Sequence, residues 1–248
     1  MNPRLLHRPL AVIFDMDGLM LDTEPLAARA WREAASGMGL AFDPTVTHAM
    51  VGRTFPDCRQ LLVDRHGDAY PVDQLMIAWS ATYEAIIARD GLVVKPGLPE
   101  LLAWLESERI PKGVATSTHH ARACAKLQRT GLLSRFSAIV CGDQVTHGKP
   151  HPEIFLTVAQ RLEVAPARCL VLEDSEPGFR ASVSAGMASI IVPDLHAPPY
   201  ADPFPEPVAM RSLHEVHRFL RELPPAGAAD AHETIDARGQ PRANRPRP

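Results

Sequence analysis

The chain has 248 residues, of which 46% are hydrophobic, so it is long enough for one large domain or two smaller ones. Its net charge of −3 and its short apolar runs, well below the roughly 18 residues of a membrane span, favour neither nucleic acid nor a membrane as a partner. The N-terminus lacks the pattern of a secretory leader, so we expect a cytoplasmic protein. The four cysteines match no zinc pattern.

Five apolar runs predict strands, and the first of them ends at two acidic residues. The runs lie at 10–14, 113–116, 138–141, 169–172 and 189–192. Helix-like stretches separate the later runs, at 98–108, 121–130, 153–162 and 176–185. This alternation is typical of right-handed βαβ crossovers. We therefore expect an α/β fold with a Rossmann-like, doubly wound parallel sheet that is covered on both faces.

The region between the first two strands breaks this rhythm, because it contains only helix-like stretches, at 24–38, 55–65 and 72–90. We expect an all-helical insert at residues 22–94, with Leu26, Trp31 and Trp79 in its core. The core domain would then comprise residues 1–21 and 95–222, with a further helix near 212–220. From 223 to 248 the chain has few large apolar residues and no period, which predicts a disordered tail.

Polar side chains follow each of the first four predicted strands in turn. They are Asp15 and Asp17, then Thr116 and Ser117, then Lys149 after a loop, and finally Glu173 and Asp174. In open parallel sheets, ligands bind beyond the carboxyl ends of the strands, so these groups should meet. Two carboxylates 4 Å apart repel by about 4 kcal/mol at an effective dielectric constant of 20. The crowding therefore predicts a divalent cation, and a site of hard oxygen ligands favours Mg²⁺ with a bound phosphoryl group.

Such a site indicates phosphoryl transfer through a carboxylate nucleophile. Asp15 would attack phosphorus, while Lys149 and the cation neutralise the phosphoryl oxygens. The hydroxyls of Thr116 and Ser117, with nearby backbone N–H groups, would bind a phosphoryl oxygen. Asp17 would protonate the leaving alkoxide and then activate the water that hydrolyses the aspartyl phosphate.

Four sequence stretches carry a resemblance to a known family. "FDMDGLMLDTEP", "VATST", "GKPHPEIF" and "LVLEDSEPGFRASVSAGM" resemble the four motifs of the haloacid dehalogenase superfamily, in its helical-cap branch. The resemblance covers about residues 8–222. It implies that Asp15 is the nucleophile, that Asp17 is the acid and base, and that Thr116 and Lys149 contact phosphate.

The same resemblance implies the metal ligands and the role of the insert. Mg²⁺ would be held by Asp15, by the backbone carbonyl of Asp17 and by Asp174, with Glu173 reaching it through water. The insert would be a cap that closes over the site and carries substrate specificity. Arg53, in the stretch "VGRT", resembles a cap arginine that related enzymes present to the substrate.

We therefore expect a Mg²⁺-dependent phosphatase that acts on a small phosphorylated metabolite, either a sugar phosphate or a nucleotide-like monoester. The pattern is similar to those of pseudouridine 5′-phosphatases and hexose 6-phosphate phosphatases. The main alternative is a sugar phosphomutase of the β-phosphoglucomutase type, which is disfavoured because Ala27 stands where those enzymes carry a histidine. A dehalogenase, a phospho-acceptor signalling domain and a non-catalytic binding protein fit the motifs less well. We expect a monomer or a weak dimer.

Overall fold

The computed structural model describes residues 7–43, 45–194 and 208–226, and a parallel sheet lies at its centre. The strand order is β3-β2-β1-β4-β5-β6. The strands are β1 Ala11–Phe14, β2 Lys112–Thr116, β3 Ala138–Cys141, β4 Cys169–Glu173, β5 Ala188–Ile191 and β6 Val208–Ala209. The chain runs outward from β1 in one direction and from β4 in the other, so strand order reverses between these two neighbours. The predicted α/β fold with a doubly wound sheet is confirmed.

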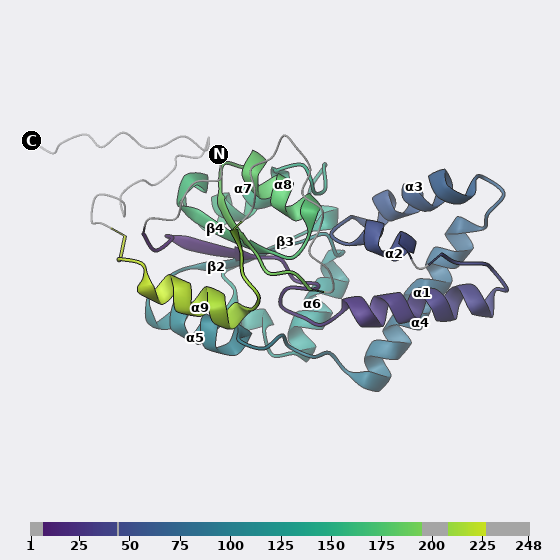
Figure 1. The fold of residues 1–248 in the computed structure, drawn as a ribbon, viewed down its shortest axis with the longest axis horizontal. Helices are drawn as coiled ribbons and strands as arrows, with labels where there is room; N and C mark the ends of the chain where they lie inside the picture. The colour runs from purple at the N-terminus through teal and green to yellow at the C-terminus, as the bar shows by residue number, and fades with distance from the viewer. Residues whose placement is uncertain (1–6, 44, 195–207, 227–248) are drawn as a thin grey trace, which may run out of the picture.

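Helices cover both faces of the sheet because its strands are apolar on both sides. The helices of this part are α5 Leu98–Ser107, α6 His120–Arg129, α7 Glu153–Arg161, α8 Glu176–Ser184 and α9 Leu213–Glu222. Val12 and Phe14 of β1 belong to one buried cluster with residues of α5, α6 and α9. Ala11 and Ile13 belong to another with residues of α7 and α8. Figure 1 shows α5 and α9 on one side of the sheet and α7 and α8 on the other.

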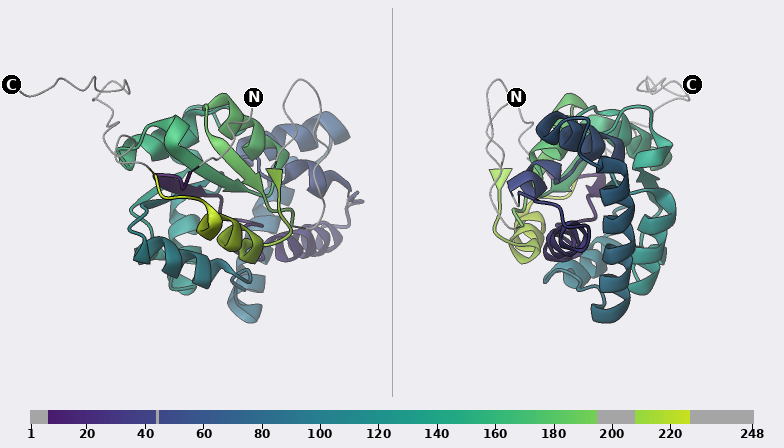
Figure 2. Two further views of the ribbon diagram at one scale, coloured as in Figure 1. Left: turned by 60° about the vertical axis from the view of Figure 1, so that its left-hand side comes forward. Right: turned by 90° about the vertical axis from the view of Figure 1, so that its right-hand side faces the viewer.

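Four helices, here called the cap helices, lie between β1 and α5 in the chain. They are α1 Glu24–Gly37, α2 Thr45–Met50, α3 Phe55–His66 and α4 Val72–Asp90. They stand beside the sheet and its helices in Figure 1 and face the viewer in the right-hand view of Figure 2. They have a buried cluster of their own, which includes Trp31, Leu62 and Leu75. The two chain segments that lead to and from them lie side by side, because Leu21 and Val94 form an antiparallel bridge.

Local capping sets where several of these helices begin. The Thr54 side chain accepts a hydrogen bond from the Asp57 backbone N–H at the start of α3, and Ser175 accepts one from Gly178 at the start of α8. Within the described residues, no helix is long and apolar enough to cross a membrane.

The structure differs from the sequence prediction in three respects. The short helix α2 was not predicted, because its six residues include two threonines and a valine and show no helical period. The two-residue strand β6 follows a proline-rich stretch and was also missed. Of the three expected cap core residues, Trp31 is buried, whereas Leu26 and Trp79 are only partly buried. The predicted tail lies, from residue 227 on, outside the described residues.

Candidate active site

The carboxyl ends of β1 and β4 bring three acidic residues together at the point where strand order reverses. Asp15 directly follows β1, and its backbone N–H donates to the carbonyl of Leu172 in β4, with an N–O distance of 3.0 Å. Glu173 is the last residue of β4, and Asp174 follows it. Carboxylate oxygens of Asp15, Glu173 and Asp174 lie within 4.8 Å of one another, and all three residues are buried. This is the position at which open parallel sheets bind their ligands.

Lys149 lies between two of these carboxylates, and its side chain is 0% exposed. Its ammonium donates to Asp15, to Glu173 at 2.6 Å and to the carbonyl of Ala115 at the end of β2 at 3.0 Å. Burial opposes the charge on Lys149, but the two carboxylates outweigh burial and raise its pKa. Lys149 is therefore a fixed positive charge beside Asp15.

Glu173 is held in place by the start of α8 as well as by Lys149. Its second carboxylate oxygen accepts hydrogen bonds from the backbone N–H groups of Asp174 and Ser175, both at 3.0 Å, and from the Ser175 hydroxyl at 2.9 Å. Both oxygens of Glu173 thus have protein partners. This leaves Asp15 and Asp174 as the carboxylates of the cluster that are freer to bind a cation.

Asp174 carries the strongest indication of a cation. Among the described residues, none donates a hydrogen bond to its carboxylate, although the side chain is buried. Burial, together with the charges of Glu173 and Asp15, raises the pKa of Asp174 well above its usual value. Burial likewise raises the pKa of Asp15 to about 8, against the effect of Lys149 and with that of Glu173. Lys149 pairs with only two of the three buried carboxylates, so the donor set fits a hard divalent cation such as Mg²⁺.

Gly18 allows the loop after β1 to approach Asp174. Its φ is +84°, and a Cβ atom at this position would lie 2.2 Å from a carboxylate oxygen of Asp174. A side chain would therefore be excluded by both conformation and space. The glycine in "DMDG" thus has a physical reason: it lets the loop that carries Asp17 pass next to Asp174.

Asp17 lies near Asp15 but has a different environment. Its carboxylate accepts hydrogen bonds from the Thr118 hydroxyl at 2.7 Å and from the Lys126 ammonium at 2.6 Å. Burial opposes the charge on Asp17, but Lys126 outweighs burial and lowers the pKa of Asp17. Lys126 also lies 5.0 Å from the centre of the Tyr83 ring, on cap helix α4. Asp17 is therefore held as a carboxylate by a contact that also reaches the cap.

Lys126 is a site residue that the sequence prediction did not include, and Thr118, which follows the second predicted strand, had been assigned no role. One signal for Lys126 is visible in retrospect. It lies on α6 between the buried residues Ala123 and Leu127, where a lysine needs an acidic partner. The partner itself is 109 positions away in the chain, so local sequence could not name it.

The remaining predicted residues lie around a cavity of about 510 Å³ between the strand ends and the cap helices. Thr116 and Ser117 line it, as does Arg53. The Ser117 hydroxyl donates to the carbonyl of Gly52 in the cap, at 2.8 Å. The Arg53 side chain is exposed, and its Nε donates to the carbonyl of Ala49 at 2.9 Å. Thus Asp15, Lys149, Glu173 and Asp174 are in one cluster, whereas Ser117 and Arg53 contact the cap backbone.

Glu24, the first residue of α1, also lines the cavity and was not predicted as a site residue. Burial and the nearby charges of Asp17 and Asp194 raise its pKa to about 7. No sequence signal separates this glutamate from the many acidic residues that begin helices.

Comparisons with known proteins agree with this geometry. A family model described as haloacid dehalogenase-like hydrolase matches residues 9–186. The chain is 35% identical to a phosphorylated carbohydrates phosphatase of Thermotoga maritima, over 73% of this chain and 83% of that protein. It is 32% identical to the β-phosphoglucomutase of Bacillus subtilis, over 73% of this chain and 81% of that protein. The crystal structure of CbbY from Rhodobacter sphaeroides in complex with phosphate has a TM-score of 0.71 and 27% identity, covering 84% and 96% of the two chains.

Proposed function

The chain belongs to the haloacid dehalogenase-like hydrolase family, as one of its phosphatases, and we propose that it hydrolyses monoesters of small phosphorylated metabolites, either sugar phosphates or nucleotide-like compounds, with Mg²⁺ and through a phosphorylated Asp15. One observation carries the proposal. Lys149 joins Asp15 and Glu173 in a buried cluster to which Asp174 adds a carboxylate without a hydrogen-bond donor among the described residues. This combination provides a nucleophile, a fixed positive charge and a place for a cation.

The residues around Asp15 support a role for it as the nucleophile. Lys149 and the cation favour the ionised carboxylate, which burial alone would protonate. We assign to Thr116, with nearby backbone N–H groups, the binding of a phosphoryl oxygen. Lys149 neutralises charge on the same oxygens. Asp15 and Thr116 lie at the ends of the neighbouring strands β1 and β2, so the sheet fixes their spacing, and Lys149 is held beside Asp15 by its hydrogen bond.

Asp17 is placed to move protons. It protonates the leaving alkoxide and then takes a proton from the water that attacks the phosphorylated Asp15. Its hydrogen bonds with Thr118 and Lys126 fix the orientation of its carboxyl group. A carboxyl group with a lowered pKa is suited to be the base of the second step, in which it takes a proton from water.

Asp15 and Asp174 are the side chains that we propose to hold Mg²⁺, together with the backbone carbonyl of Asp17, and Glu173 lies beside them. When bound, Mg²⁺ supplies positive charge that brings a phosphoryl dianion next to several carboxylates and orients it. The raised pKa values of Asp15 and Asp174 support this assignment, because a cation would restore both carboxylates.

The alternative is a sugar phosphomutase, and one position argues against it. Ala27 lines the cavity where mutases of this branch carry a histidine. An alanine methyl group cannot exchange protons with a sugar hydroxyl. Release of inorganic phosphate, rather than transfer of the phosphoryl group within a sugar phosphate, would distinguish hydrolysis from mutase activity.

The division of the chain into a core and a cap at residues 22–94 is also a proposal. The bridge between Leu21 and Val94 supports this division, because the two chain segments that connect the core to the cap lie side by side there. Closure of such a cap would exclude water and shape the leaving-group site. The cytoplasmic location and the monomeric or weakly dimeric state stay predictions.

The proposed function can be tested with Asp15→Asn. Phosphate release from a panel of monoesters is measured with Mg²⁺ and with EDTA. We expect Asp15→Asn to lower kcat by about three orders of magnitude or more, because an amide is not a nucleophile at phosphorus. EDTA should abolish the wild-type activity, and added Mg²⁺ should restore it. Asp68→Asn, at an exposed turn, is the matched control. Activity that survives Asp15→Asn in a folded protein would refute the mechanism.

A further inference from the structure

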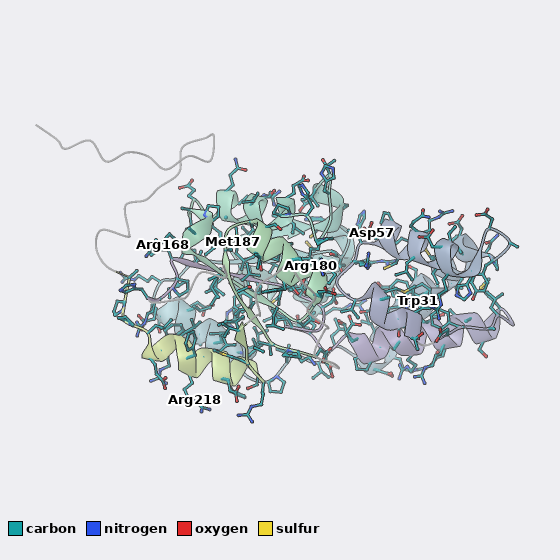
Figure 3. The ribbon with its side chains drawn as sticks, turned by 45° about the horizontal axis from the view of Figure 1, so that its top comes forward. Trp31, Asp57, Arg168, Arg180, Met187 and Arg218 are labelled. Carbon is teal, nitrogen blue, oxygen red and sulfur yellow. The ribbon has the colours of Figure 1, made fainter. Side chains whose placement is uncertain are left out.

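One wall of the cavity consists of aromatic side chains from the cap helices. Trp31 of α1, Phe55 of α3, and Trp79 and Tyr83 of α4 all line it. The Trp31 and Trp79 rings are stacked with centroids 4.9 Å apart, and those of Trp79 and Tyr83 are stacked 5.2 Å apart. Phe55 lies 6.1 Å from Trp79 with its ring tilted by 35°. Figure 3 shows Trp31 among the cap helices, far from Arg168 and Arg218. The four rings therefore contact one another in series along this wall of the cavity.

Only part of this wall is open to a ligand. Trp31 is stacked on Phe42 inside the cap, and Tyr83 has Lys126 over its ring. Both residues are almost fully buried. Phe55 is 46% exposed, and Trp79 is partly exposed. Phe55 and Trp79 are therefore the rings of the wall that have surface free for a ligand.

The rest of the cap side of the cavity is lined by both apolar and polar side chains. The apolar ones are Ala27, Ala28, Met50 and Val51, and the polar ones include Thr23, Glu24, Thr47 and Arg53. An open-chain polyol can therefore find hydrogen-bond partners here, but it cannot make the ring contacts that the aromatic wall offers. A flat apolar ring loses little on entry and gains contact with the aromatic wall.

We propose that the preferred substrates are phosphate monoesters whose leaving alcohol carries a planar aromatic or heteroaromatic ring that packs against Phe55 and Trp79. This inference rests on the proposed function and narrows its substrate class to ring-bearing, nucleotide-like monoesters. The cavity of about 510 Å³ is far larger than a phosphoryl group requires, so it has room for such a ring.

The test compares primary phosphate monoesters whose leaving alcohols differ mainly in the group that would meet the wall. These are benzyl phosphate, cyclohexylmethyl phosphate, which has a saturated ring of the same size, and erythritol 4-phosphate. We expect kcat/KM to be about fivefold higher for benzyl than for cyclohexylmethyl phosphate, and at least about tenfold higher than for erythritol 4-phosphate. Acetyl phosphate, which has no ring, reports on the phosphatase chemistry alone.

Variants of the wall separate recognition from structural damage. Phe55→Leu and Trp79→Leu should each raise KM for benzyl phosphate about fivefold and leave kcat within about twofold, because the contact is made equally before and during reaction. The loss of activity on acetyl phosphate, which has no ring, should be smaller than the loss on benzyl phosphate. Phe55→Tyr, which keeps the ring, should behave as wild type. Ile77→Ala is the control, because Ile77 is 71% exposed on α4 and lies outside the cavity lining.

Two results would overturn the inference. One is a kcat/KM for erythritol 4-phosphate that equals or exceeds that for benzyl phosphate in the wild type. The other is an equal loss on all four compounds in both leucine variants, with Phe55→Leu fully folded. A wild-type protein that does not hydrolyse even acetyl phosphate would instead refute the proposed function, and the substrate inference would fall with it.

Discussion

Two aspartates separated by one residue have pKa values shifted in opposite directions. Burial raises the pKa of Asp15. The like charge of Glu173 adds to this increase, and Lys149 opposes it only in part. Asp17 is also buried, but Lys126 and Thr118 lower its pKa. Environments that separate the pKa values of two carboxyl groups often separate their roles, which agrees with the proposal that Asp15 is the nucleophile and Asp17 the proton carrier. The two directions differ because Lys149 is shared between Asp15 and Glu173, whereas Lys126 pairs with Asp17.

Glu24 predicts a pH dependence of stability in the metal-free protein. Its pKa is raised from 4.5 to about 7, so its stabilising contribution is fully present below pH 4.5 and is lost as the pH rises through 7. Relative to Glu24→Gln, the wild type should lose up to about 3 kcal/mol in the free energy of unfolding between pH 4.5 and pH 8, at about 1.4 kcal/mol per pKa unit.

Urea unfolding of both proteins in EDTA, at several pH values, measures this difference. The comparison with Glu24→Gln removes the contributions that other titrating groups make to both proteins. Parallel stability curves for the two proteins would show that Glu24 ionises normally and that its environment in the folded state has been misjudged.

At the scale of elements, the start of α8 orients the site as much as the strands do. The backbone N–H groups of Asp174 and Ser175, directly before α8, and the Ser175 hydroxyl hold one oxygen of Glu173, and Lys149 holds the other. Gly178 makes this close approach possible, since a Cβ atom there would lie 1.8 Å from Glu173. These contacts of Glu173 therefore connect β4, the start of α8 and Lys149.

Gly178→Ala should displace Glu173 and disturb Lys149 with it. We expect a loss of about 1–3 kcal/mol in the free energy of unfolding, as for other overpacked sites, together with reduced phosphatase activity. Gly37→Ala is the matched control, because nothing lies within 4 Å of the Cβ position and Gly37 ends an exposed stretch of α1. Chemical denaturation of both variants measures the loss of stability. Equal unfolding midpoints for Gly178→Ala and Gly37→Ala would contradict the close approach of α8 to Glu173.

At the scale of the whole molecule, the protein has buried apolar clusters on the two faces of the sheet and a separate one within the cap helices. The cavity lies where these two parts meet. Lys95 helps to fix the connection between them, since its ammonium lies 2.9 Å from Asp22 and also pairs with Asp194 after β5. Asp194 is only 7% exposed, so Lys95 is its counter-charge in a poorly hydrated place.

Lys95→Met should leave Asp194 buried without that partner. We expect it to lower the free energy of unfolding by about 3 kcal/mol, because an unpaired buried charge is costly. The double variant Lys95→Met/Asp194→Asn should recover most of this loss, since it removes the charge itself. Urea denaturation provides the measurement, and a double variant no more stable than Lys95→Met would show that the charge of Asp194 is not the cause.

Much of the fold follows from local sequence patterns. The strand 138–141 and the helix 72–90 have the predicted limits, and the other predicted strands and helices lie within two residues of theirs. Apolar runs and helical periods report burial directly, so they locate elements without knowledge of their partners. The pattern is weakest where an element is very short, and α2 and β6 were accordingly missed.

Some residues of the candidate site could likewise be predicted from local sequence, and others could not. Local patterns were enough to predict that Asp15, Lys149, Glu173 and Asp174 would meet, because Asp15, Glu173 and Asp174 lie at strand ends, Lys149 comes after the third strand and a loop, and the carboxyl ends of parallel strands share one edge. The folded structure was needed to find that Lys126 holds Asp17 and that Phe55 and Trp79 line the cavity. Those contacts join residues far apart in the chain through helix packing, and no local period or motif encodes the direction in which a packed side chain finally points.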